Sequence, residues 1–206
     1  MVPLSFILLM ALMAATSPGP ATLGIANTAM QRGPKAGLAF AAGVTCGSLT
    51  WSVTAALGLG AVMLAHGWIL EVVRYAGAGY LLFLGFKAAR SALRPGQEAA
   101  REASQGPLSR VFFQGLLLHL TNPKAILFFG SLYALVLSPS ATAGDILTVI
   151  VAVTVQSALI FHGYALMFSR GAVMRAYVRA RRGFDGVFAL VFGVAGLKLL
   201  TMRLTG

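Results

Sequence analysis

Long apolar stretches separated by short polar segments run along the whole chain. Residues 36–70 contain no Asp, Glu, Lys or Arg, and neither do residues 146–169. A transmembrane helix needs about 20 consecutive apolar residues, so both stretches are long enough to cross a bilayer. We therefore expect an all-α integral membrane protein. The pattern predicts six spans, at about Leu4–Ala29, Ala36–Ala65, Trp68–Ala89, Val111–Leu137, Gly144–Phe168 and Phe184–Leu204.

Proline interrupts the first and the fourth predicted spans, within Ser17-Pro18-Gly19-Pro20 and Thr121-Asn122-Pro123-Lys124. Proline lacks an N–H and clashes with the preceding helical turn. In lipid, the freed carbonyls must be satisfied by protein or by a water-lined cavity. Interruptions at matching places in two halves of a chain point to the substrate site of a transporter. The candidate substrate-binding residues are therefore Pro18, Gly19, Pro20, Asn122, Pro123 and Lys124.

The spans divide into two groups of three around the polar segment 91–109. Three crossings reverse the direction of the chain, so we expect a single transmembrane domain, residues 1–206, built from two inverted repeats at about 1–90 and 110–206. Pro18 follows Leu4 by 14 residues, and Lys124 follows Arg110 by 14 residues. At ~1.5 Å per residue both breaks lie roughly 20 Å deep, entered from opposite faces. We therefore expect the two breaks to meet inside the membrane.

Positive charge gathers in the loops that follow the first, third and fifth predicted spans. The chain carries a net charge of +11, and these three loops hold 12 of its 16 Lys and Arg residues. The positive-inside rule then places these loops, including the linker 91–109, in the cytoplasm and both termini outside it. The same rule explains the basic excess without nucleic acid, so the expected surroundings are a lipid bilayer. A homo-oligomer is left open.

Lys124 is the one formally charged residue deep within a predicted span. A lysine at the centre of a membrane helix costs about 2.5–3.5 kcal/mol, so it needs a role. It either attracts a substrate carboxylate or titrates during coupling, or it serves structurally by snorkelling or by bonding freed carbonyls. Asn122 either contacts a ligand or caps the following helix. Gly19 offers free amides at a new helix start, which attract anions, or merely permits a kink.

Five further polar residues are candidates for proton coupling or for lining a cavity: His119, His162, Gln114, Gln156 and Asn27. Each histidine has an ordinary structural role as its alternative. Two separated histidines without a carboxylate in the membrane are too few ligands for a metal site. No cofactor is expected, and no nucleophile, orienting acid and metal occur together to suggest an enzyme. Gly43 and Gly47 share one face of the second span and predict close helix contact there.

At these motifs the chain resembles the lysine exporter family, including its homoserine/threonine exporter branch. The resemblance covers nearly the whole length and rests on Ser17-Pro18-Gly19-Pro20, Gly33-Pro34-Lys35-Ala36-Gly37, residues 77–85 and residues 122–129. It implies proton-driven export of amino acids across the bacterial inner membrane. Two positions depart from the pattern. Ala21 stands where members often have Asn, and Gly130-Ser131-Leu132-Tyr133 stands where many carry a Pro-Gln element.

The absence of Asp and Glu from the membrane interior bears on the substrate. A second positive charge on the substrate would lack a carboxylate partner, which favours a neutral amino acid of the homoserine, threonine or leucine type. Freed carbonyls also hold cations, so the argument leaves basic substrates open. The alternative is an exporter of divalent metal cations or another small solute. Hard cations need several oxygen ligands, and only Glu71 and Asp145 lie near spans on the outer side.

Overall fold

The computed structural model describes residues 3–17, 19–65, 67–93, 106–136, 141–170, 173, 183, 185–194, 196–197 and 200. These residues form helices and turns and contain no strand, as expected for an all-α protein. The helices are α1 (Leu4–Thr16), α2 (Pro20–Ala65), α3 (Gly67–Leu93), α4 (Leu108–Leu120), α5 (Pro123–Val136) and α6 (Ala143–Phe168). A further apolar helix occupies Asp185–Val194.

Both predicted proline breaks are confirmed. Helix α1 ends at Thr16, and Ser17 is extended with ψ 132°, as the residue before a proline prefers. Helix α2 then begins with Pro20, whose missing N–H costs nothing in the first helical position. The second break separates α4 from α5, which begins with Pro123. Pro18 itself lies outside the described residues.

Helix α2 is two helical arms joined by a tight turn at Gly33. Gly33 has φ 78°, in the left-handed region that glycine adopts without strain, and Pro34 starts the second arm. Sequence analysis placed the end of the first span at Ala29 and the start of the second at Ala36, whereas both arms continue to this turn. A Cβ on Gly37 would come within 2.7 Å of the Ala29 Cβ, so the arms pack tightly beside it.

The other predicted boundaries differ from the structure by a few residues. Helix α3 extends to Leu93 and α4 starts at Leu108, so the linker predicted at 91–109 begins and ends within helices. Residues 94–105 of that linker lie outside the described residues. The sixth predicted span is described as helix over Asp185–Val194, and its remainder is described only at isolated positions.

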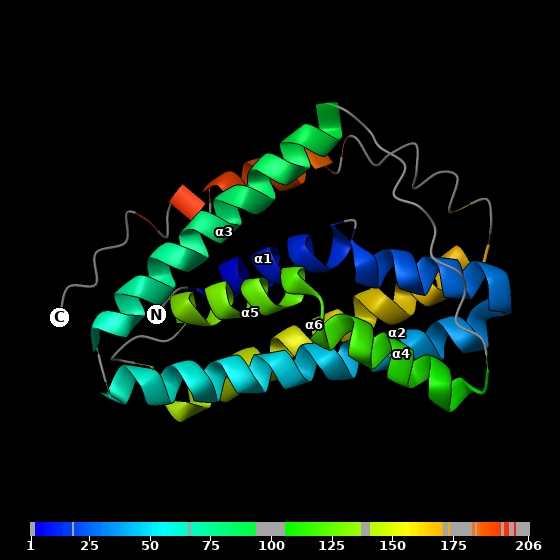
Figure 1. The fold of residues 1–206 in the computed structure, drawn as a ribbon, viewed down its shortest axis with the longest axis horizontal. Helices are drawn as coiled ribbons and strands as arrows, with labels where there is room; N and C mark the ends of the chain where they lie inside the picture. Colours follow the sequence, from blue (N-terminus) through cyan, green and yellow to red (C-terminus); the bar gives the residue numbers. More distant parts are fainter. Residues whose placement is uncertain are drawn as a thin grey trace.

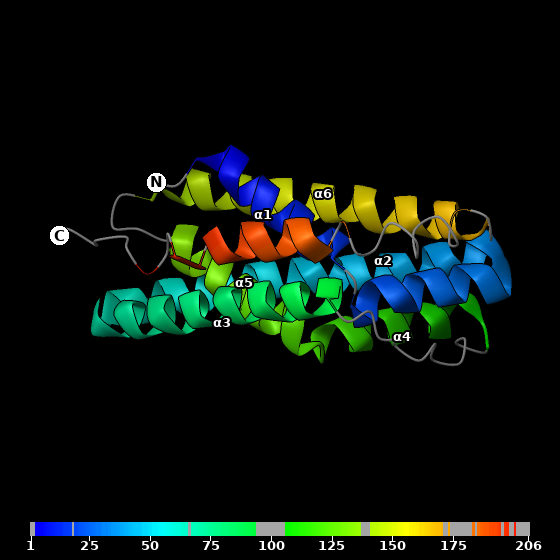
Figure 2. The same ribbon diagram turned by 90° about the horizontal axis from the view of Figure 1, so that it is seen from above.

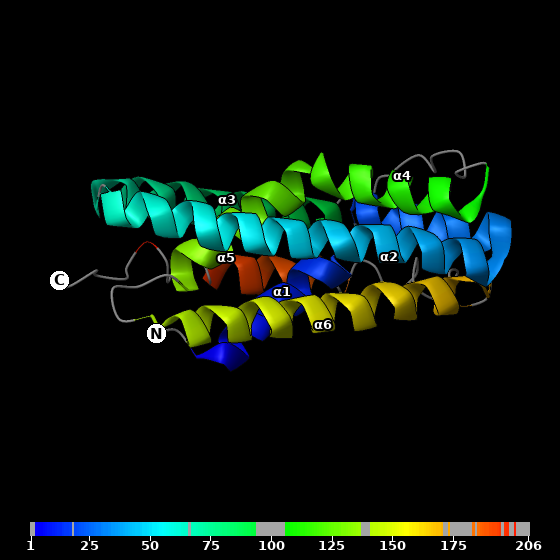
Figure 3. The same ribbon diagram turned by 90° about the horizontal axis from the view of Figure 1, so that it is seen from below.

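The two broken segments run in opposite directions (Figure 1). One consists of α1 and the first arm of α2, and the other of α4 and α5. Helices α1 and α5 share a hydrophobic core in which Ile7 and Met10 lie in one cluster with Phe128 and Leu132. Helix α2 makes its most extensive contacts with α4 (Figure 2) and with α6 (Figure 3). The two breaks therefore fall inside the bundle.

Glycines bring α2 and α4 into close contact. A Cβ on Gly43 would collide with the backbone carbonyl of Phe112, and one on Gly115 with that of Phe40. A Cβ on Gly47 would come within 2.9 Å of the His119 Cβ. The close contact predicted at Gly43 and Gly47 is therefore confirmed, with α4 as the partner. Small residues permit such an approach between membrane helices.

Large apolar side chains cover much of the outer surface. Leu57, Leu159 and Leu190 are each about 70% exposed, on three different helices. By length and composition, two helical stretches of the described residues are long and apolar enough to cross a bilayer: Pro20–Gly58, which contains the turn at Gly33, and Ala143–Phe168. Helix α1 has 13 residues and covers roughly 20 Å, less than a hydrocarbon core of about 30 Å. A broken span therefore needs both of its halves to cross.

Candidate functional site

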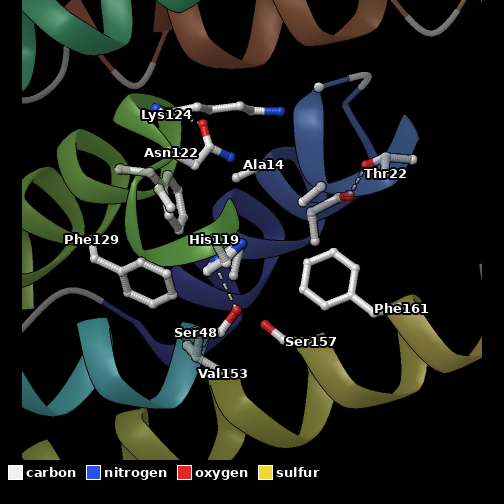
Figure 4. Close-up of a pocket in the computed structure, with 16 residues that line it drawn as sticks. Ala14, Thr22, Ser48, His119, Asn122, Lys124, Phe129, Val153, Ser157 and Phe161 are labelled. Atoms are coloured by element: carbon white, nitrogen blue, oxygen red, sulfur yellow. Dashed lines mark hydrogen bonds between the residues drawn. The ribbon is translucent and has the colours of Figure 1, made fainter. Parts of the chain in front are cut away.

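A cavity lies where the two breaks meet (Figure 4). Its empty space, counted with its open side, is about 480 Å³. Its walls come from α1, the first break, α2, α4, the second break, α5 and α6. The lining residues are Ala11, Ala14, Ala15, Gly19, Ala21, Thr22, Ser48, His119, Asn122, Lys124, Ala125, Phe128, Phe129, Val153, Ser157 and Phe161.

Lys124 joins the two breaks. Its Nζ donates a hydrogen bond of 2.9 Å to the carbonyl oxygen of Ser17, and its side chain crosses Gly19. A Cβ built on Gly19 would lie 3.4 Å from the Lys124 Cδ, in ordinary van der Waals contact. The prediction that the breaks approach each other is therefore confirmed. The structural role considered for Lys124, bonding a freed carbonyl, is also present, and its role toward substrate stays a prediction.

The carbonyls freed at the first break are satisfied by side chains from elsewhere. Thr22 donates through Oγ1 to the Ala15 carbonyl at 3.4 Å. The Tyr164 hydroxyl of α6 donates to the Thr16 carbonyl at 3.5 Å. Both bonds are long compared with the 2.7–2.8 Å typical of hydroxyl donors, so they are weak. The Lys124 bond to Ser17 is the short one in this set.

Asn122 caps α5. Its Oδ1 accepts a hydrogen bond of 3.0 Å from the Lys124 backbone N–H, in the manner of an N-cap residue. The side chain is buried and lines the cavity, with its amide beside the Lys124 side chain (Figure 4). The capping alternative for Asn122 is thus confirmed, and ligand contact remains a prediction.

His119 stands in the cavity wall below Asn122 (Figure 4). It is 5% exposed, its Nε2 lies 3.1 Å from the Ser48 Oγ, and its ring meets Phe161 edge-on. The second ring nitrogen, Nδ1, is buried and has no hydrogen-bond partner among the described residues. Of the five additional polar candidates, His119 is therefore the one that this cavity includes.

The other four candidates do not line the cavity. His162 Nδ1 lies 2.8 Å from the carbonyl of Ala158 in its own helix. Gln156 donates to the Leu8 carbonyl at 3.1 Å, and Asn27 accepts from Gln31 at 2.7 Å. The Oε1 atom of Gln114 is buried without a partner among the described residues. Cavity lining is thus not found for these four, and proton coupling by them stays a prediction.

Sequence reasoning missed three hydroxyl residues of the cavity, Thr22, Ser48 and Ser157. Thr22 had a signal, because a hydroxyl in the first turn after a proline break can reach back to a freed carbonyl. Ser48 follows Gly47, which packs on His119, but that contact depends on how α2 meets α4. Ser157 had no signal beyond its place beside Gln156. In the sequence, the aromatic residues that line the cavity also look like ordinary core residues.

Lys124 is the single formally charged residue among the described residues that line the cavity. Within the described part of the chain, no three His, Cys, Asp or Glu side chains gather into a potential metal site. The cavity therefore presents one positive charge, several neutral hydrogen-bonding groups and apolar walls.

Comparison with known proteins gives the family. The model for the LysE type translocator matches residues 12–203, nearly the whole chain. The chain belongs to this family of translocators. The LysE type translocator described here is therefore a membrane transport protein.

The translocator is also similar to curated efflux proteins. It is 30% identical to a threonine efflux protein of Salmonella typhi over 195 residues, 93% of this chain and 94% of that protein. It is 32% identical to a leucine efflux protein of Klebsiella pneumoniae over 192 residues, 90% of this chain and 89% of that protein. No solved structure gives a significant match.

Proposed function

We propose that this translocator is a secondary active exporter of neutral amino acids. It would move them out of the bacterial cytoplasm across the inner membrane, driven by protons moving inward. Two relatives named for threonine and leucine efflux support the substrate class. The observation that carries the proposal is the position of Lys124, which lies at the meeting of two broken spans and is the one formally charged residue of the described cavity lining.

Lys124 binds the substrate carboxylate in this proposal. The Lys124 Nζ that now donates to the Ser17 carbonyl turns to the carboxylate, a stronger acceptor because it is charged. The Ser17 carbonyl then accepts from the substrate ammonium. Gly19 lies under the lysine side chain and leaves the backbone open to the same groups. The exchange gives every charged group of a zwitterion a partner.

Alternating access around the two breaks moves the substrate. The antiparallel course of the broken segments supports two inverted repeats, about 1–90 and 110–206, that rock around the site. The charge distribution supports cytoplasmic loops after the first, third and fifth spans, with both termini outside. Among the titratable side chains, Lys124 and His119 line the cavity, so these two are our candidates for proton coupling.

The proposal makes this protein a transporter and not an enzyme. The alternative substrate, a divalent cation, finds one cation and no carboxylate among the lining residues. No observation on the described residues favours it. The experiment below distinguishes amino-acid substrates from divalent cations.

The deciding experiment is uptake into everted membrane vesicles, in which an exporter accumulates its substrate. A panel of labelled neutral and basic amino acids is offered with and without a protonophore. We expect accumulation of a neutral amino acid that collapses with the protonophore and is absent from vesicles lacking the protein. No uptake of any amino acid by protein shown to be present and folded would overturn the proposal and direct the assay to metal cations.

A further inference from the structure

Buried side chains lie on both sides of the cavity along the length of the bundle. One set lies toward the end where α1 and α6 begin and where α2 and α5 end (Figure 1 and Figure 3). Its members are Ile7, Ser52, Tyr133 and Val149, each four positions from a cavity-lining residue, namely Ala11, Ser48, Phe129 and Val153. Each member is at most 1% exposed. We call these four residues the tyrosine layer.

A second buried set lies on the opposite side of the cavity, toward the turn at Gly33. Its members are Ile25, Val44 and Ala165, each four positions from a lining residue, namely Ala21, Ser48 and Phe161. They belong to one hydrophobic cluster, and we call them the aliphatic layer. The helices run along the length of the bundle, so a substrate that crosses the membrane through the cavity passes both layers.

The two layers differ by one hydrogen bond. In the tyrosine layer, the hydroxyl oxygens of Ser52 and Tyr133 lie 2.6 Å apart and join α2 to α5. The side chains of the aliphatic layer contain no polar atom. When helices part and water enters, a hydroxyl pair exchanges its mutual bond for bonds to water, whereas apolar side chains only lose their burial. Parting α2 from α5 at Ser52 therefore costs less than parting an apolar contact of the same size.

The hydroxyl pair is not needed to fill space. An alanine and a phenylalanine would pack at these two positions without burying a polar group. The pair is satisfied only while α2 and α5 keep one relative position, so its bond marks a closed arrangement of these helices. Helix α5 also carries Lys124 in its first turn. A substrate that draws Lys124 away from Ser17 therefore acts on the helix that holds Tyr133.

We propose that Ser52 and Tyr133 form the gate through which substrate leaves the cavity. Their hydroxyls bond each other in the closed gate and bond water in the open one. The inference rests on the proposed function and adds an exit to it. The gate faces away from the cytoplasm, because the proposed topology places the start of α1 outside. Neither residue lines the cavity, so the gate controls the rate of release and not substrate binding.

The test measures the face of the membrane from which position 52 can be reached. Cys46 is the one cysteine of the chain, so Cys46→Ser gives a cysteine-free background for Ser52→Cys. A charged, membrane-impermeant methanethiosulfonate is applied to spheroplasts, which present the outer face, and to everted vesicles, which present the cytoplasmic face. We expect Ser52→Cys to react several-fold faster from the outer face.

Two matched controls lie on the same helices. Val44→Cys on α2 belongs to the aliphatic layer and should react faster from the cytoplasmic face. Ser131→Cys on α5 replaces a buried serine that donates to the Leu127 carbonyl of its own helix at 2.7 Å and does not line the cavity. It should react from neither face. Equal labelling of Ser131→Cys and Ser52→Cys would show a general loosening of the bundle and overturn the gate.

Deleting one hydroxyl at a time separates a gate from a packing contact. In Tyr133→Phe, the Ser52 hydroxyl can donate to the carbonyl four residues earlier, as Ser48 does to Val44 at 3.2 Å. The closed layer then stays satisfied and becomes harder to wet. In Ser52→Ala, the buried Tyr133 hydroxyl loses its partner, which weakens closure. A thiol at Ile7→Cys should therefore react more slowly from outside in Tyr133→Phe and faster in Ser52→Ala.

The outcomes separate the gate from the proposed function, because labelling requires no known substrate. The gate is overturned if Ser52→Cys and Ile7→Cys both stay unlabelled from the outer face in protein that elutes as folded in size-exclusion chromatography. A change of the same sign in Tyr133→Phe and Ser52→Ala also overturns it, since a merely structural bond loosens the layer in either variant. Both results leave amino-acid export standing. Outer-face labelling without transport of any amino acid removes the proposed substrate and keeps the gate.

Discussion

The two breaks find hydrogen-bond partners for their backbone groups in different ways. At the first break, the Thr16 and Ser17 carbonyls depend on Tyr164 of α6 and Lys124 of α5, over a hundred residues away in the chain. At the second break, neighbouring residues supply most of the bonds, and the Tyr80 hydroxyl of α3 adds one to the Lys124 carbonyl at 3.2 Å. The N–H and hydroxyl of Thr121 both bond the Leu117 carbonyl, and Asn122 caps α5 through Oδ1.

The difference follows from composition. Pro18 and Pro20 remove two backbone donors within three residues, and Gly19 between them has no side chain to replace them. Thr121 and Asn122 bring two polar side chains to a break with a single proline. The first break is therefore shaped by the rest of the bundle, whereas the second forms from its own sequence. Changes at Lys124 should disturb both, and changes at Asn122 chiefly the second.

Lys124→Met should have the largest effect, because it removes the bond between the breaks and the proposed carboxylate ligand together. A hydrogen bond to a charged group contributes about 1.5–3 kcal/mol, so we expect transport to fall at least about tenfold. Uptake into everted vesicles measures this. Lys87→Met on α3 is the control, since Lys87 is exposed and outside the cavity. Full transport by Lys124→Met would contradict the mechanism.

Substitutions of increasing size at Gly19 should come next. An added Cβ would only touch the Lys124 Cδ, at 3.4 Å, so Gly19→Ala should keep most of the transport activity. Gly19→Leu places further carbons where the lysine side chain lies and should reduce transport several-fold by displacing Nζ from Ser17. Equal activity of both variants would show that the Lys124 side chain does not need to pass over Gly19 for transport. The assay is uptake at matched protein levels.

Asn122→Ala should have a smaller and more local effect. Loss of an N-cap side chain costs about 1 kcal/mol, and the affected helix is α5. Thermal unfolding in detergent should show a lowered midpoint, while Asn122→Asp, which keeps an oxygen acceptor, should retain more of the stability. If Asn122→Asp is as unstable as Asn122→Ala, capping is not the reason that Asn122 matters.

The smallest effects should come from a matched pair of hydroxyl deletions, which compares the breaks directly. Tyr164→Phe removes the donor to Thr16 at the first break, and Tyr80→Phe removes the donor to the Lys124 carbonyl, 3.2 Å away, at the second. Both bonds are long, so each variant should lose less than about 1 kcal/mol of stability. Tyr164→Phe should affect transport more, because the first break has fewer local bonds.

Local chemistry made the breaks predictable. The position of each break follows from Pro20 and Pro123, and the meeting of Lys124 with the first break follows from counting residues along two antiparallel spans. The role of Asn122 was narrowed to two alternatives, because an Asn before a proline can cap or bind. None of these inferences required knowledge of which helices are neighbours.

The cavity-lining residues outside the two breaks were not predictable, because they depend on helical phase and on helix packing. His119 and Gln114 lie on the same helix, yet His119 lines the cavity and Gln114 does not. The difference depends on the face of α4 that Gly47 of α2 contacts. Ser48 and Ser157 belong to the cavity for the same reason, since the spacing of α2, α4 and α6 turns them inward. The spacing between these helices cannot be inferred from a single sequence.

The tight turn at Gly33 joins the two arms of α2, and Gly37 of the second arm packs closely on Ala29 of the first. Pro20 is where the first arm meets the first break. Gly43 and Gly47 of the second arm lie so close to α4 that a Cβ on either would crowd it. Because α4 ends at the second break, we expect a rotation of α2 at Pro20 to move both breaks together.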